Sequence, residues 1–438
     1  MKKVFGLFLS LIVLMGLSAC KKGYSTLTFV ASGESSVTLV KVGEPFDISL
    51  EYSMDGKNWK PYTIGETIFL LEDKLSFRAE ESGNKRFSKG DDNYYQFKIS
   101  GKIAAKGSIM SLLDRNCGKN AVPSYAFVSL FCECTTLTEA PELPATELAE
   151  SCYSGMFFYC TSLTKAPELP AKELASWCYF GMFSGCKSLT KAPMLPATEL
   201  APSCYAFMLQ GCESLTKAPT LPAAELAPSC YAWMFEGCTN LTEAPTLPAT
   251  ELAEGCYLGM FEGCTNLTEA PTLPATELAE GCYGDMFRGC TSLTKAPDLP
   301  ATKLAESCYS GMFYGCTRLT KAPELPAKEL APSCYAFMLK GCESLTKAPT
   351  LPAKELAENC YKGMFSLCHN LSYIKALFVT PPFGSHFDYR HPYSPLGVYS
   401  DAWLWNVART GTFVKSKDAT WDVRGASGVP EGWTVLTE

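Results

Sequence analysis

The feature of this sequence that most constrains its fold is a repeat of 26 residues. A Cys-Tyr pair occupies the same place in every copy, and its cysteines are Cys152, Cys178, Cys204, Cys230, Cys256, Cys282, Cys308, Cys334 and Cys360. A degenerate copy precedes them, with Ala126 and Phe127 in the place of the pair. Units of roughly 20 to 50 residues are too small to bury a core alone, so they are expected to stack on one another.

The apolar residues of each unit predict a short helix. In the first full copy they are Cys152, Tyr153, Met156, Phe157 and Cys160. Their spacing of i, i+1, i+4, i+5 and i+8 would place them in one stripe on a helix. A glycine stands before the second cysteine in most copies, as at Gly185, where a left-handed helix end favours glycine.

The rest of the unit predicts a short strand and an extended return. Residues 164–166 are the strand candidate, and Pro167 and Pro170 then favour an extended segment. The predicted fold class is therefore an α/β repeat solenoid of the leucine-rich-repeat type, with a short strand and a short helix in each 26-residue unit. This solenoid is expected to span residues 111–377, with one degenerate and nine full repeats.

The repeat resembles the BspA-like leucine-rich repeats of Bacteroides-type surface lipoproteins. The degenerate copy, from Ala126-Phe127 through Cys134 and Leu137, is the closest to that pattern. The nine main copies resemble a longer variant, in which Cys-Tyr replaces Ala-Phe and a Leu-Pro-Ala segment is added. The resemblance implies a solenoid fold and a place in the cell envelope, and it says little about the ligand.

The first residues have the pattern of a targeting segment. Residues 1–19 join two lysines, an apolar run and a small-residue end, and Cys20 follows directly. This resembles a bacterial lipobox, which implies that Cys20 is lipidated and holds the protein in the outer membrane. An ordinary signal peptide with an incidental cysteine is the alternative. Cell-surface display is preferred over the periplasmic face, although Lys21 and Lys22 provide no acidic export signal.

The two flanks of the array differ from it in composition. Residues 20–110 contain six alternating or apolar segments separated by Gly, Asp and Asn, which predicts a small all-β domain. The segments are residues 26–30, 36–40, 46–52, 67–71, 75–79 and 95–99. Residues 378–438 are expected to form a C-terminal cap, with a short helix at 402–407 and strands at 411–415 and 432–436. The tryptophans of this cap would cover the last unit, or would form an aromatic sugar platform.

Twenty-two cysteines in an exported chain raise the question of disulfides. On a helix, Cys152 and Cys160 would lie about 12 Å apart, which is too far for a disulfide bond. Most of the thiols are therefore expected to be buried ladder residues, with bridges between neighbouring coils left open. A metal site is not expected, because paired Cys-x-x-Cys motifs are absent; His386 and His391 form a weak loop pair.

Several function classes are disfavoured. The net charge of −7 and the lack of a basic block argue against nucleic-acid binding. Motifs of an activated serine and phosphate-binding glycine loops are absent, so no catalytic site and no cofactor are expected.

One exposed slot of the repeat, meaning one position that recurs every 26 residues, gives a candidate binding stripe. Its residues are Lys165, Lys191, Lys217, Glu243, Glu269, Lys295, Lys321 and Lys347. A solvated face is the simpler interpretation, and a charge pattern for one partner is the alternative. The preferred function is non-catalytic recognition of a protein or a cell surface, as in adhesion. A glycan-binding accessory of a polysaccharide-uptake system is the second hypothesis, and a purely structural surface-layer protein is the third.

Overall fold

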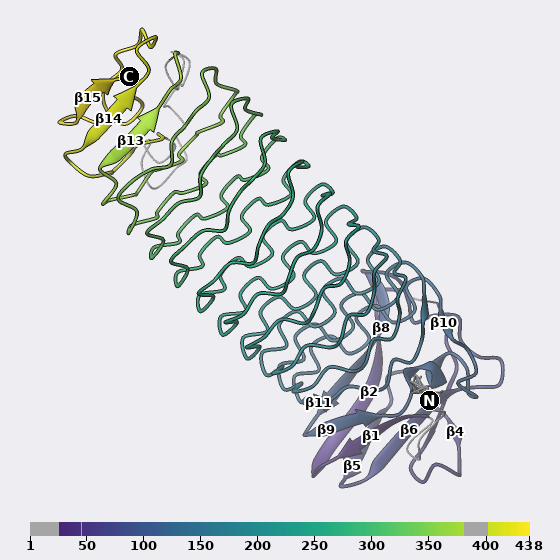
Figure 1. Ribbon diagram of the computed structural model, residues 1–438. Coiled ribbons are helices and arrows are strands. Elements are labelled where there is room, and N and C mark those ends of the chain that lie inside the picture. Colours follow the sequence, from purple (N-terminus) through teal and green to yellow (C-terminus); the bar gives the residue numbers. More distant parts are fainter. Residues whose placement is uncertain (1–25, 45, 381–401) are drawn as a thin grey trace, which may run out of the picture.

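The computed structural model describes residues 26–44, 46–380 and 402–438. A β-rich N-terminal region, a long stack of coils and a small C-terminal sheet follow one another along the molecule (Figure 1). The predicted signal segment at 1–19, Cys20 and the histidine pair lie outside the described residues.

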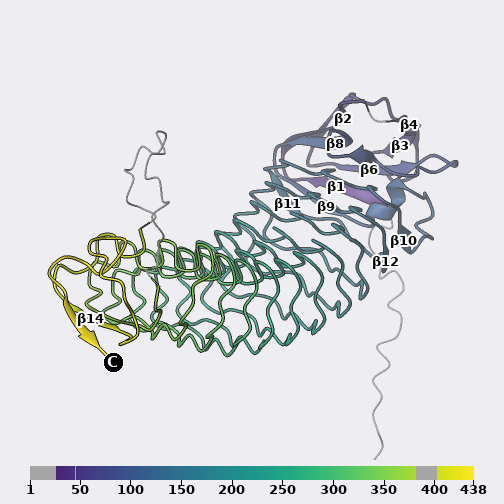
Figure 2. The ribbon, with the colours of Figure 1, turned by 90° about the horizontal axis from the view of Figure 1, so that it is seen from above.

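The predicted α/β repeat solenoid with a helix in each unit is wrong. The described part of the chain contains no α-helix, and its helical content is one 3-10 helix, η1 (Ile109–Leu112), outside the repeats. The leucine-rich-repeat assignment falls with it, because that repeat was expected to alternate one strand and one helix. What the structure has is a stack of non-helical coils between several β-sheets (Figure 2).

The backbone of the predicted helix explains why it does not form. Every fourth residue has a positive φ, as at Ser151 (52°), Gly155 (58°) and Tyr159 (56°). Such left-handed residues interrupt an α-helix. The amide of Met156 donates to Tyr153 three residues back, and the amide of Gly155 donates to Phe180 in the next coil. Short turns and bonds between coils thus replace the helical bonds to the fourth residue back.

The apolar residues that predicted the helix are nevertheless the core. Cys152, Tyr153, Met156, Phe157 and Cys160 are all buried, and so are their equivalents in the later copies. The tyrosine rings stack from coil to coil, with Tyr179 and Tyr205 centred 5.8 Å apart and inclined by 6°. A spacing of four residues therefore points the same side chains inward in a series of turns as it would on a helix.

The strand predicted in each unit is replaced by isolated β-bridges between neighbouring coils. Residues 149–372 contain no strand of several paired residues, and parallel bridges such as Lys165 to Lys191 and Lys295 to Lys321 replace them. At the start of the stack the two-stranded sheet β10 (Ala121–Val122) with β12 (Glu147–Leu148) is parallel as well.

Two sheets form the N-terminal region, and each of the six predicted strand segments overlaps a strand. The six-stranded sheet has the order β11 (Leu137–Glu139), β9 (Ile103–Lys106), β1 (Leu27–Ala31), β6 (Lys74–Ala79), β3 (Leu50–Ser53) and β4 (Lys60–Pro61). The four-stranded sheet has the order β5 (Thr67–Leu71), β2 (Glu34–Val42), β8 (Asn93–Ser100) and β7 (Ser88–Gly90). Their neighbours pair antiparallel, except that β11 runs parallel to β9.

The N-terminal region continues directly into the stack. The amides of Phe87 and Phe97 donate to Ala126 and Leu130 of the first coil, at 2.7 Å and 2.8 Å. The ring of Phe97 also stacks on Phe131, with centroids 5.3 Å apart. One hydrophobic core runs through both parts. The predicted domain boundaries at residues 110 and 377 stay predictions.

The C-terminal cap closes the other end of the stack. The parallel sheet β13 (Tyr373–Ala376), β14 (Thr412–Lys415) and β15 (Thr434–Thr437) extends the line of coil contacts. The helix predicted at 402–407 is absent, and a turn lies there instead. Its carbonyls at Trp403 and Trp405 accept hydrogen bonds from the amides of Phe365 and Leu367, as a further coil would.

None of the helical segments in the described ranges reaches the length and hydropathy needed to cross a bilayer.

Candidate functional site

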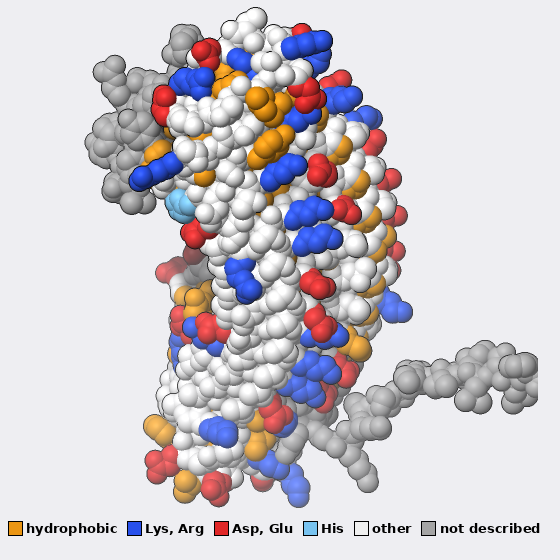
Figure 3. Space-filling view, turned by 60° about the vertical axis from the view of Figure 1, so that its left-hand side comes forward, with side chains coloured by type: hydrophobic (Ala, Val, Ile, Leu, Met, Phe, Trp, Pro, Cys, Tyr) orange, Lys and Arg blue, Asp and Glu red, His pale blue; other side chains and the backbone are white. Residues whose placement is uncertain are grey.

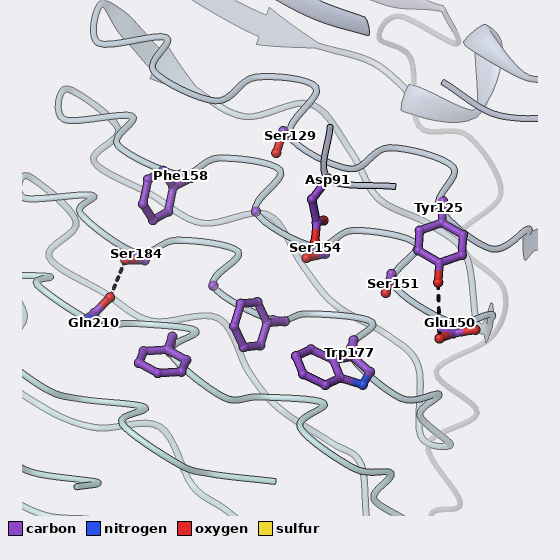
Figure 4. Close-up of a pocket in the computed structure, with 14 residues that line it drawn as sticks. Asp91, Tyr125, Ser129, Glu150, Ser151, Ser154, Phe158, Trp177, Ser184 and Gln210 are labelled. Atoms are coloured by element: carbon purple, nitrogen blue, oxygen red, sulfur yellow. Dashed lines mark hydrogen bonds between the residues drawn. The ribbon is translucent and has the colours of Figure 1, made fainter. Parts of the chain in front are cut away.

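The candidate site is a groove of about 640 Å³ where the first coils meet the N-terminal region. It extends from the turn between β7 and β8 across four successive coils of the stack, and its residues are drawn in Figure 4. Small residues form its floor, aromatic rings form one wall, and two carboxylates lie at its rim.

The floor exists because small residues fall in neighbouring slots of neighbouring coils. Gly155 and Gly181 occupy the same slot, both with a positive φ, and Ser154 and Ser184 lie beside them almost completely buried. In the next two coils this slot holds Phe207 and Trp233, so the hollow ends there. The Ser184 hydroxyl donates to the Gln210 side-chain oxygen at 2.8 Å, which fixes the amide at that end.

Trp177, Phe180 and Phe207 form a row of rings in the wall, and Phe158 also lines the groove. Trp177 is 43% exposed, and its ring centroid lies 5.1 Å from that of Phe180. Phe180 meets the edge of Phe207 at 5.3 Å, and Phe207 stacks on Trp233 at 4.9 Å with an angle of 11°. Each ring therefore supports the next, and Trp177 is left with a face toward solvent.

The carboxylates come from two distant parts of the chain. Glu150 belongs to the first full repeat, and its carboxylate accepts a long hydrogen bond of 3.3 Å from the hydroxyl of Tyr125. Asp91 lies in the turn between β7 and β8 and extends toward the coil of Ser154 (Figure 4). Desolvation and, after it, the charge of Glu150 raise the pKa of Tyr125, so this hydroxyl stays protonated at neutral pH.

The acids of the groove are not balanced by a basic residue within the described part of the chain. Among the described residues that line it, none is Lys, Arg or His. Neither Asp91 nor Glu150 forms an ion pair with another described residue. The nearest cations in sequence to Asp91 are Arg86 and Lys89, and both pack over the ring of Phe46.

The predicted charge stripe lies outside this groove. The structure places Lys165, Lys191, Lys217, Glu243, Glu269, Lys295, Lys321 and Lys347 in successive coils, all exposed. Parallel bridges join several neighbours in this stripe, and Lys217 pairs with Glu243 at 3.2 Å. Charged side chains follow one another along the stack in Figure 3. Glu269 and Lys295 line a second, proline-rich hollow of about 620 Å³.

The cysteines form two buried columns. In the second column the thiol of Cys160 donates to the carbonyl of Phe131 at 3.1 Å, and the later copies repeat this bond. Both columns consist of thiols and not of disulfides. Burial raises the pKa of Cys186 to about 12, so the reactive thiolate is scarce at neutral pH. Among the described residues no group of three or more His, Cys, Asp and Glu could hold a metal ion.

Three of the four C-terminal tryptophans belong to the core. Trp403, Trp421 and Trp433 are buried, and Trp403 packs on Phe365 and Phe378 at the end of the core. A platform needs exposed ring faces, which these three buried residues do not provide; Trp405 is half-buried, and for it the alternative stays a hypothesis. Covering of the last coil is the role that the geometry supports.

The sequence analysis missed the groove. The available signal was in the slot before each Cys-Tyr pair, where Trp177 stands and the other full copies have Ser, Gly or Asn. Trp233 is a packing residue, because its ring lies over Gly259, where an added Cβ would be 2.4 Å from the indole.

In the comparisons with known proteins, no family model, no curated protein and no solved structure matches this chain.

Proposed function

We propose that this chain is a non-catalytic recognition protein of the cell envelope, which binds a protein on another cell or in an extracellular matrix. Lipidation of Cys20 would anchor it in the outer membrane, with the stack displayed at the cell surface. The observation that carries the recognition role is the groove beside the N-terminal region. It combines an exposed aromatic face at Trp177 with carboxylates that have no ion-pair partner among the described residues.

The groove has the general properties of a binding site. It is concave, and a few polar groups lie beside an aromatic wall. Large aromatic residues dominate the energy of many protein interfaces, because they bury much area with few rotatable bonds. The coils behind Trp177 hold it through backbone bonds, such as that from its amide to Pro202 at 3.1 Å.

The chemistry of the described residues favours binding over catalysis. The buried thiols have raised pKa values, which makes them poor nucleophiles at neutral pH. The polar groups of the groove are hydroxyls, one amide and two exposed carboxylates. No cofactor and no nucleic acid enters the proposal, in keeping with the acidic composition.

A glycan is the second candidate partner, in the role of an accessory lipoprotein for polysaccharide uptake. The observation that favours it is the exposed Trp177 ring beside the hydroxyls of Ser151 and Ser154. A sugar ring presents an apolar face to such an indole and hydroxyls to such a floor.

The test is binding of the intact chain to an array of matrix and cell-surface proteins and to a glycan array. We expect a protein ligand whose binding Trp177→Ala reduces about tenfold or more. Phe69→Ala is the control, because Phe69 is 79% exposed and lies outside the groove, and this variant should bind normally. A protein ligand whose affinity is unchanged by Trp177→Ala would contradict the proposal. So would an enzymatic activity that one point mutation removes. Protease treatment of intact cells tests surface display.

A further inference from the structure

We infer that the groove receives an arginine side chain of a protein partner, with the guanidinium between the Trp177 ring and the Glu150 carboxylate. This inference rests on the proposed function, and it names the chemistry that the groove recognises. Charge complementarity is the first argument. Asp91 and Glu150 make the groove acidic, and the described residues that line it include no cation.

The position of the ring relative to the acid is the second argument. Residues 26 apart lie side by side in neighbouring coils, so Glu150 adjoins the backbone of Ser176, one residue before Trp177. Figure 4 shows Glu150 and Trp177 at the same end of the groove. A cation over the indole face within about 6 Å is attracted by the ring, and a nearby carboxylate adds hydrogen bonds.

The protein itself contains this arrangement elsewhere, complete with its arginine. The guanidinium carbon of Arg78 lies 3.9 Å from the ring centroid of Trp59, and Nε of Arg78 donates to Glu51 at 2.8 Å. A second instance joins Arg288 to the ring of Tyr314 at 4.9 Å and to Glu262 at 3.5 Å. The groove has the ring and the carboxylate, and its described lining includes no arginine.

Arginine fits this arrangement better than lysine does. Its planar guanidinium can stack on the indole and still donate in the ring plane to a carboxylate. Its three methylenes would pack along the rings of Phe180 and Phe207. An anionic partner is disfavoured by the two carboxylates, and a neutral glycan gains nothing from their charge.

The experiment compares three fluorescently labelled peptides that differ only in the residue placed at regular intervals. They are Gly-Ser peptides that carry spaced arginines, lysines or citrullines, and citrulline has the shape of arginine without its charge. Affinity for the intact chain is measured by fluorescence anisotropy at low and high salt. We expect arginine to bind best, citrulline at least tenfold more weakly, and added salt to weaken the binding of the arginine peptide.

Two variants locate the arginine. Trp177→Ala and Glu150→Gln should each weaken the arginine peptide about fivefold or more. Their controls are Phe69→Ala and Glu254→Gln. Glu254 occupies the slot of Glu150 four coils later, and both residues lie outside the groove. Both controls should change affinity less than twofold, and thermal melting of all four variants checks that they are folded.

Equal binding of the arginine and citrulline peptides would overturn the inference, and so would equal losses in the variants and their controls. The proposed function fails separately. If Trp177→Ala weakens the binding of a protein ligand from the array but Glu150→Gln does not, the recognition role stands and the inference of a bound arginine is wrong. A glycan that needs Trp177 in place of a protein ligand would overturn both.

Discussion

Three slots in each 26-residue unit hold a residue in the left-handed backbone region. In the first full copy these are Ser151, Gly155 and Tyr159, and the later copies repeat the pattern without exception. An L-residue other than glycine in this region costs about 1 kcal/mol or more, so glycine is the natural occupant. The middle slot departs from this rule at Asp285 and Phe337, and also at Phe207 and Trp233, with φ of 57° and 51°. Their stacked rings form the support of the groove wall and offset this cost by packing.

The middle slot allows a prediction at the residue scale. Gly181 and Gly259 share that slot, with φ of 57° and 59°, but an added Cβ meets open space at Gly181 and the Trp233 ring at Gly259. We expect Gly181→Ala to lower the free energy of unfolding by about 1 kcal/mol, the backbone cost alone. Gly259→Ala should lower it by roughly 2–4 kcal/mol, because the ring must also move. Urea denaturation measures both.

A double variant separates the two causes. When Trp233→Ala is already present, Gly259→Ala should cost no more than Gly181→Ala does. Equal losses for the two glycines in the otherwise unchanged chain would show that the indole does not constrain this slot.

At the scale of elements, the units are held together by columns of equivalent residues and not by strands or helices. Tyrosine rings stack in one column, and thiols donate to carbonyls in another. Threonine hydroxyls form a third, as where Thr242 donates to Thr216 at 3.2 Å. The tyrosine column has one unfavourable feature. The hydroxyls of Tyr153, Tyr231 and Tyr257 are buried without a hydrogen-bond partner among the described residues.

This feature predicts that replacement of one of these tyrosines by phenylalanine increases the stability of the protein. Tyr257→Phe keeps the stacked ring and removes a buried hydroxyl that is not satisfied, so the protein should become more stable by up to about 1 kcal/mol. Tyr62→Phe is the contrast, because its hydroxyl accepts from the Leu39 amide at 2.9 Å and donates to Glu66. That variant should lose about 1 kcal/mol. Thermal melting of both variants checks the signs, and a loss at Tyr257 would reveal a partner for its hydroxyl.

At the scale of the whole molecule, the stack is a one-dimensional structure closed at both ends. Each coil bonds to its two neighbours, and the N-terminal sheets and the C-terminal turn at Trp403 supply the last partners. Such an array tolerates a change in the number of units, because every internal unit meets equivalent surfaces on both sides.

Deletion of one unit tests this organisation. Removal of residues 283–308 joins Cys282 to Tyr309 and keeps the Cys-Tyr order, and it brings Gly259 against Gly311 in the middle slot. We expect a soluble, folded protein with its buried columns one member shorter. Removal of residues 283–295, half a period, should abolish folding because apolar slots would face polar ones. Circular dichroism and melting compare the two, and equal behaviour would exclude the stacked arrangement.

The sequence by itself determined the period, the inward-facing residues and the places of the N-terminal strands. A strict 26-residue recurrence permits little else, since each unit must cover the apolar edge of the next. The spacing of Cys152, Met156 and Cys160 could not determine the backbone conformation. Steps of four residues suit an α-helix and equally suit a series of turns with one left-handed residue in four.

Only the tertiary structure decided between these two conformations and created the groove. Bonds between coils, such as that from Gly155 to Phe180, use the amides that a helix would need, and they exist only once the coils are stacked. The groove likewise joins Asp91 of a β-turn, Glu150 of the first full repeat and Trp177 of the second. Glu150 and Trp177 come together because stacking places residues 26 apart side by side. Asp91 joins them from outside the repeat, because the N-terminal sheets pack against the first coil.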